Sequence, residues 1–202
     1  MLGIRVASDT NLFGKHIGNE LKYIQQLLNS EDADQKLNPF LPRFEKAFGK
    51  LVGAKYVIGQ NSGTSTLHSC LMAAGVNPGD EVISPAHTVV MCAFATLHQN
   101  AIPVFADVNP RTFNIDPKDL EKKITPRTKA IISVHMHGLP ADMPHIMKIA
   151  RRYKIPVIED SAQSIFGSIN GTKQLAETTN RIKVSQITWI KIIQEIFSLS
   201  DK

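Results

Sequence analysis

The pattern of hydrophobic and polar positions alternates between two periods from residue 56 onward. Short apolar runs predict buried strands over five segments: 56–60, 81–85, 102–108, 130–135 and 156–160. The intervening segments have the spacing of amphipathic helices, at 64–74, 88–99, 117–123 and 142–153. Asp116 and Asp142 are predicted N-caps, and Pro117 suits a first helical position. This order predicts an α/β fold with three layers, in which helices flank a mostly parallel sheet.

Residues outside this alternation divide the chain into three parts. Two helical stretches, at about 18–29 and 41–52, precede the first strand, so residues 1–55 are predicted to form an N-terminal helical segment. The α/β domain covers 56–173, and residues 174–202 are predicted to be a divergent helical tail. Helical spacing in that tail connects five apolar residues: Val184, Ile187, Ile190, Ile193 and Phe197.

Composition changes this picture little. The 202 residues are 43% apolar and 20% charged, which is typical of an ordinary globular protein. The net charge of +5 invites a nucleic-acid partner, but the basic pairs 122–123 and 151–152 are isolated within helical patterns and are interpreted as solvated faces. We see neither a secretory signal nor a run long enough to span a membrane. The chain is therefore predicted to be cytoplasmic, with no nucleic-acid or membrane partner.

The stretch GQNSGTSTL, residues 59–67, leads from a predicted strand directly into a helix. Unpaired N–H groups at a helix start attract anions, and Gly63 permits close approach of the backbone. The hydroxyls of Ser62 and Thr64 add donors, so this stretch suits a phosphate group. The alternative interpretation is that Ser62 or Thr64 only caps the helix.

Histidines and cysteines offer further candidate chemistry. His87 follows the strand at 81–85, where its flat ring is able either to stack on an aromatic ligand or simply to pack locally. His135 and His137 would share a face if their strand continued that far, but no third metal ligand stands at a suitable spacing. Cys70 and Cys92 lie in apolar runs and are interpreted as buried free thiols. We predict no metal site.

The run PVIED ends a predicted buried strand on two carboxylates, Glu159 and Asp160. A carboxylate there is unfavourable unless it caps the next segment or meets a cation. Ligands of open α/β sheets bind beyond the carboxyl ends of the strands. A phosphate site, a flat ring and a carboxylate at that edge together fit pyridoxal 5′-phosphate (PLP), whose ring nitrogen a carboxylate keeps protonated.

From about residue 44 to residue 173 the chain resembles the DegT-like nucleotide-sugar aminotransferases. The matching segments are FEKAFGKLVGAKY, NSGTSTL, GVNPGDEVISPAHT, IPVFADVNPRTFNIDP, ITPRTKAIISVHMHGLPADM and IPVIEDSAQS. The resemblance implies part of the large domain of a PLP-dependent transferase of the type I aspartate aminotransferase fold. It also implies a homodimer that transfers an amino group, with glutamate as the expected donor, to a keto nucleotide-sugar in polysaccharide or natural-product biosynthesis.

The resemblance further implies a role for each matching site residue. Gly63 and Thr64, with Ser62 beside them, would hold the cofactor phosphate, and His87 would stack on the pyridine ring. Asp160 would pair with the pyridine nitrogen and Gln163 would lie near the ring hydroxyl. Glu159 would then be the less important of the two carboxylates.

The catalytic lysine of that family follows a Gly-Asp-containing loop and a serine–phenylalanine strand, and the corresponding window here reads RIKVSQITWIKII. Lys183 and Lys191 lie in this window without the expected surroundings, so no catalytic residue is assigned. One alternative is therefore an inactive fragment that at most binds the cofactor or a partner chain. Another is a pyridoxamine-phosphate-dependent sugar dehydratase, in which histidine replaces the lysine, but no histidine follows His145.

Overall fold

The computed structural model describes residues 25, 40–164, 168–169, 172–173 and 181–184. Five strands form one sheet: β1 (Glu81–Pro85), β2 (Ile102–Ala106), β3 (Thr128–Val134), β4 (Val157–Asp160) and β7 (Arg181–Val184). The α-helices are α3 (Phe40–Val52), α4 (Gly63–Ala73), α5 (Met91–His98), α6 (Pro117–Lys123) and α7 (Met143–Tyr153). A 3₁₀ turn, η2 (Met136–Gly138), follows β3, and β5 (Ser168–Ile169) pairs with β6 (Thr172–Lys173).

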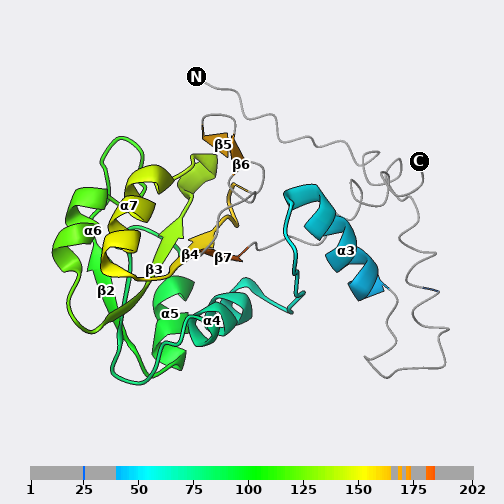
Figure 1. Cartoon of the computed structure of the whole chain (residues 1–202), viewed down its shortest axis with the longest axis horizontal. Coiled ribbons are helices and arrows are strands. Elements are labelled where there is room, and N and C mark those ends of the chain that lie inside the picture. Colours follow the sequence, from blue (N-terminus) through cyan, green and yellow to red (C-terminus); the bar gives the residue numbers. More distant parts are fainter. Residues whose placement is uncertain (1–24, 26–39, 165–167, 170–171, 174–180, 185–202) are drawn as a thin grey trace, which may run out of the picture.

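The sheet has the order β2-β1-β3-β4-β7, and every neighbouring pair in it is parallel. Helices α4 and α5 cover one face, where Leu71 packs with Val82 and Ile158. Helices α6 and α7 cover the other face, where Ile146 packs with Val157 (Figure 1). The predicted three-layer α/β fold is confirmed, and all strand carboxyl ends meet at one edge, which we call the carboxyl edge.

The predicted helix starts of α6 and α7 are also confirmed. The Asp116 side chain accepts a hydrogen bond from the Lys118 N–H, with Pro117 in the first turn. Asp142 accepts from the His145 N–H at the start of α7. Each cap satisfies a backbone donor that the helix itself leaves unpaired. None of the helices in the described part of the chain is long and apolar enough to cross a membrane.

The strand predicted over 56–60 does not form. The chain there has no strand neighbour in the described sheet, and the N–H of Gly59 donates to the Glu45 carboxylate of α3 at 2.8 Å. Val57 packs against α3, while Tyr56 and Ile58 are 79% and 77% exposed. The apolar residue that is partly buried in this run, Val57, therefore contacts a helix and not a neighbouring strand of the described sheet.

The tail differs from its prediction over the four residues that the structure describes. Residues 181–184, which lie within the tail predicted to be helical, form β7 beside β4, with Lys183 opposite Glu159 and Val184 opposite Asp160. The apolar residues that suggested helical spacing after Val184 lie outside the described residues. Of the helix predicted at 18–29, only residue 25 is described, and it is helical.

Glu81 stabilises the amino end of β1 through contacts with the loop before β3. Its side chain is 5% exposed, and its carboxylate accepts from the Thr125 hydroxyl at 2.5 Å and from Arg127 Nε at 3.0 Å. The Thr125 hydrogen bond, followed by the contribution of Arg127, lowers the pKa of Glu81 below its usual 4.5, against the opposing effect of burial. A lowered pKa adds stability above pH 4.5 that is lost as pH falls through the folded-state value.

We therefore expect Glu81→Gln to lower the free energy of unfolding at pH 7 by about 1.5–3 kcal/mol, the usual range for hydrogen bonds to a charged group. The difference in melting temperature from wild type should shrink as pH falls below 4.5, in thermal melts between pH 7 and pH 3. Glu121→Gln, which alters the exposed ion pair with Arg152, is the control and should change stability little at either pH. A difference for Glu81→Gln that stayed constant with pH would contradict this role for the carboxylate.

Candidate functional site

The loops at the carboxyl edge carry the predicted site residues. His87 follows β1, His137 lies in the turn after β3, and Asp160 and Gln163 are at the end of β4 and just beyond it. Helix α4 runs against the strand direction, because its carboxyl end leads through a short turn to the amino end of β1. Its amino end, with Gly63, therefore lies towards the carboxyl edge. The fold thus brings the candidate residues to the carboxyl edge of the sheet.

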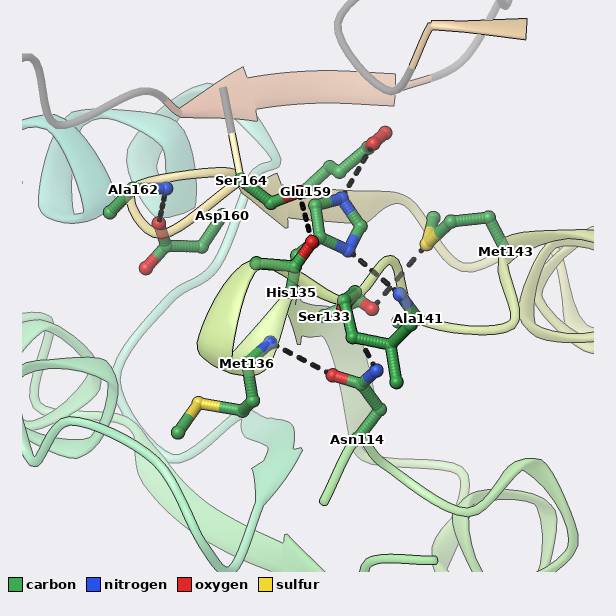
Figure 2. Close-up of polar contacts among 12 residues, drawn as sticks. Asn114, Ser133, His135, Met136, Ala141, Met143, Glu159, Asp160, Ala162 and Ser164 are labelled. Atoms are coloured by element: carbon green, nitrogen blue, oxygen red, sulfur yellow. Dashed lines mark hydrogen bonds and ion pairs between the residues drawn. The ribbon is translucent and has the colours of Figure 1, made fainter. Parts of the chain in front are cut away.

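Asp160 is a buried carboxylate without an ion-pair partner among residues 40–164. It is 8% exposed and accepts a hydrogen bond from the Ala162 N–H at 3.0 Å (Figure 2). Within residues 40–164, no lysine, arginine or histidine side chain makes an ion pair with it. Burial raises the pKa of Asp160, while the hydrogen bond from Ala162 opposes the rise. Such a group favours binding of a cation that is able to share its buried position.

The orientation of Asp160 follows from strand alternation. Ile158, two residues earlier, packs in the core beneath α4 and α5, so Asp160 projects to the same side. The two buried thiols on those helices agree with this placement. Burial, with a smaller contribution from the charge of Asp160, raises the pKa of Cys70 to about 11 and of Cys92 to about 12. Both cysteines are free, as predicted, and they are poor nucleophiles at neutral pH.

Glu159 points to the opposite side of the sheet and is fully buried against His135 (Figure 2). His135 Nε2 lies 2.9 Å from Glu159 Oε1, and the Ala141 N–H donates to His135 Nδ1 at 3.0 Å. Because Nδ1 accepts a hydrogen bond, the proton of a neutral imidazole is on Nε2, which donates to the carboxylate. Glu159 is thus bonded within the protein, whereas Asp160 is left for a ligand.

The amino end of α4 has both a side-chain cap and unpaired N–H groups that suit an anion. Ser62 is the N-cap, and its hydroxyl accepts from the Ser65 N–H at 3.1 Å. The N–H groups of Gly63 and Thr64 make no hydrogen bond to another described residue. A helix start with unpaired N–H groups is a favourable position for a phosphate. The side chain of Ser62 is therefore used by the helix, and the two following N–H groups are the better candidates for phosphate contact.

Three aromatic rings lie together beyond the carboxyl ends of β1, β2 and β3, and we call them the ring cluster. The ring centroid of His87 is 5.6 Å from that of Phe113 and 6.2 Å from that of His137. The rings of Phe113 and His137 are 6.1 Å apart in an edge-to-face arrangement. Phe113 escaped the sequence analysis, although it follows a predicted strand end. Its position in a loop after a predicted strand could have identified it, because every loop at the carboxyl edge is a candidate for ligand contact.

Gln163 connects the loop after β4 to the turn after β3. Its side-chain oxygen accepts from the His137 N–H at 2.7 Å, and the Ser164 hydroxyl donates to the carbonyl of Gly138 at 3.1 Å. His135 and His137 do not converge, since β3 ends before them and the two rings contact different partners. Among the described residues no group of three or more metal-binding side chains is found.

Comparison with known proteins adds to this geometry. The sequence profile of the DegT/DnrJ/EryC1/StrS aminotransferase family matches residues 15–184. The chain belongs to this family. The match passes residue 173, where the resemblance seen in the sequence ended, and includes β7.

Two curated relatives are named for the sugars involved. GDP-perosamine synthase of Caulobacter vibrioides is 42% identical over 156 residues, which are 77% of this chain and 42% of that protein. UDP-2-acetamido-2-deoxy-3-oxo-D-glucuronate aminotransferase of Pseudomonas aeruginosa is 48% identical over 137 residues, covering 68% of this chain and 38% of that protein. The family member described here thus spans about two fifths of the length of these relatives.

A similar solved structure was determined with a bound cofactor. NtdA from Bacillus subtilis, determined with bound cofactor PMP, has a TM-score of 0.68 and 40% identity, covering 75% of this chain and 34% of that chain. The similarity confirms the α/β fold. Among residues 40–164, the Asp160 carboxylate has no cationic partner, and the N–H groups of Gly63 and Thr64 have no acceptor. These groups fit a ligand that carries a protonated ring nitrogen and a phosphate.

Proposed function

We propose that this chain is the cofactor-binding part of a PLP-dependent nucleotide-sugar aminotransferase. The observation that carries the proposal is Asp160, a carboxylate that is 8% exposed and has no cationic partner within residues 40–164. A protonated pyridine nitrogen is the cation that this position suits. The proposal extends to a keto nucleotide-sugar as amino acceptor, because both relatives are named for nucleotide-linked sugars. It also includes glutamate as donor and a homodimer, as the resemblance to the family implies.

The residues of the chain would divide the work of binding. The N–H groups of Gly63 and Thr64 hold the phosphate, and His87 packs against the ring. Asp160 keeps the ring nitrogen protonated, since a buried negative charge favours the charged form of a neighbouring cation. Gln163 would lie near the ring hydroxyl. When bound, PLP supplies an electron sink for cleavage of a bond at the amino-bearing carbon.

Proton transfer during transamination requires a general base, and the described site offers no lysine for it. Within residues 40–164, no lysine occurs in the loops that follow β1, β2, β3 and β4. This observation favours a second candidate function, a cofactor-binding chain without catalysis of its own. The lysines that remain near the family position are Lys183, opposite Glu159 in β7, and Lys191, outside the described residues.

Borohydride reduction separates the two candidates. We expect the purified chain to bind PLP with a shifted visible absorption band, and any reduced covalent adduct to map by mass spectrometry to Lys183 or Lys191. Lys183→Ala and Lys191→Ala are the paired variants that identify the attachment point. An adduct at either position would support an active aminotransferase, and binding without an adduct would support the cofactor-binding chain. Failure to bind PLP would refute both.

A further inference from the structure

Phe113 is an exposed aromatic side chain whose position is nevertheless fixed. The residue is 46% exposed, and its backbone has φ +57°, a conformation that residues other than glycine rarely adopt. Its N–H donates to the carbonyl of Asn109 at 2.8 Å, and the N–H of Asn109 donates to the carbonyl of Asn114 at 2.9 Å. Backbone strain of this kind persists where the surrounding contacts determine the conformation, often at functional sites.

Asn114 fastens this loop to the turn that carries His137. Asn114 is 2% exposed, and its side chain donates to the carbonyl of Leu139 at 3.0 Å and accepts from the Met136 N–H at 2.9 Å (Figure 2). The amide thus uses both of its ends to connect the loop after β2 with the turn after β3. Phe113 and His137 are held on this common support, and both of their rings contact His87.

We infer that Phe113 is a positioning residue that fixes the His87 ring for contact with the cofactor; the inference rests on the proposed function. His87 itself is exposed and follows β1 by two residues, so its own loop restricts it little. The contact with Phe113 limits the orientations of the imidazole before the cofactor binds. Preorganisation of this kind strengthens binding because less side-chain freedom is lost in the complex.

The test compares PLP binding by Phe113→Leu with binding by the matched control Phe105→Leu. Phe105 is also an exposed phenylalanine, 48% exposed on strand β2, and lies outside the ring cluster. We expect Phe113→Leu to bind PLP about 3- to 10-fold more weakly, the range for loss of one aromatic contact. The affinity for inorganic phosphate should stay unchanged, since the proposed phosphate site is at the start of α4. Phe113→Tyr, which keeps the ring, should bind PLP as wild type does.

A second readout requires no cofactor. The carbon-bound protons of the His87 ring, assigned by their loss in His87→Gln, should shift in the NMR spectrum of Phe113→Leu because the neighbouring ring current is removed. They should remain in place in Phe105→Leu. A merely structural defect would instead weaken PLP and phosphate binding together, and that result would overturn the inference.

The outcomes also separate this inference from the proposed function. If wild type binds PLP and Phe113→Leu binds it equally well, the positioning role is wrong while the cofactor site stands. If wild type binds no PLP, the proposed function is wrong and the role of Phe113 is overturned with it.

Discussion

Asp160→Asn is expected to abolish stable retention of PLP while raising the thermal stability of the cofactor-free chain. Asparagine preserves the shape of the side chain and the bond from the Ala162 N–H, so the variant removes only the charge. Loss of one member of a buried charge pair weakens binding by about 2–5 kcal/mol, which is roughly 30-fold or more. Equilibrium titration with PLP, followed by its absorption band, measures this change.

The stability effect has a defined pH dependence. Burial raises the pKa of Asp160 above its ordinary 3.8, so the folded chain binds that proton more tightly than the unfolded chain does. The folded state therefore loses stability as pH rises from 3.8 through the folded-state pKa. We expect the melting temperature of Asp160→Asn to exceed that of wild type at pH 7, and the difference to vanish as pH falls towards 3.8.

Glu121→Gln is the control for this experiment, because Glu121 pairs with Arg152 at the surface. It should leave PLP binding unchanged. Equal PLP affinity in Asp160→Asn and wild type would exclude Asp160 as the partner of the ring nitrogen. Increased stability together with lost binding would show that the buried charge is maintained for the ligand at the expense of the fold.

Sequence reasoning located most of the sheet because parallel strands buried on both faces read as short apolar runs. The prediction failed at 56–60, where a similar apolar run packs against α3. It also failed at 181–184, where residues predicted as helix form a strand. Both errors concern pairing partners distant in the chain: Gly59 bonds to Glu45, and β7 pairs with β4. Local periodicity carries no information about which partner is present.

The candidate site shows the same limit. The pair Glu159 and Asp160 is visible in the sequence, and strand alternation predicts that they face opposite sides. Their different environments are not visible, since His135 reaches Glu159 from a neighbouring strand end 24 residues earlier. Phe113 was missed because its backbone conformation and its contact with His87 depend on Asn114. The Asn114 side chain donates a hydrogen bond to the carbonyl of Leu139, which lies 25 residues later in the chain.

The second large effect is expected from Glu159→Ala, which should lower the free energy of unfolding by about 3–5 kcal/mol, because it combines an unsatisfied buried donor with the cavity left by the side chain. Glu159 and His135 are both fully buried, and removal of the carboxylate leaves the His135 Nε2–H without its acceptor in a space closed to water. For a chain of this size, 1 kcal/mol corresponds to about 2–4 °C in melting temperature, so the decrease should be roughly 10 °C. Thermal melts at pH 7 measure it.

Glu159→Gln is the informative comparison. A neutral His135 that donates from Nε2 is able to use the amide oxygen of glutamine as its acceptor, so this variant should lose much less stability than Glu159→Ala. If the glutamine variant were as unstable as the alanine variant, the pair would depend on the charge of Glu159, and a hydrogen bond from Nε2–H to a neutral oxygen would not account for its contribution. The backbone N–H of His135 donates to the backbone carbonyl of Asp160 at 3.1 Å. A shift of His135 after removal of the Glu159 carboxylate should therefore move Asp160 and weaken PLP binding as well. The carboxylate that faces away from the candidate site would then position the one that faces it.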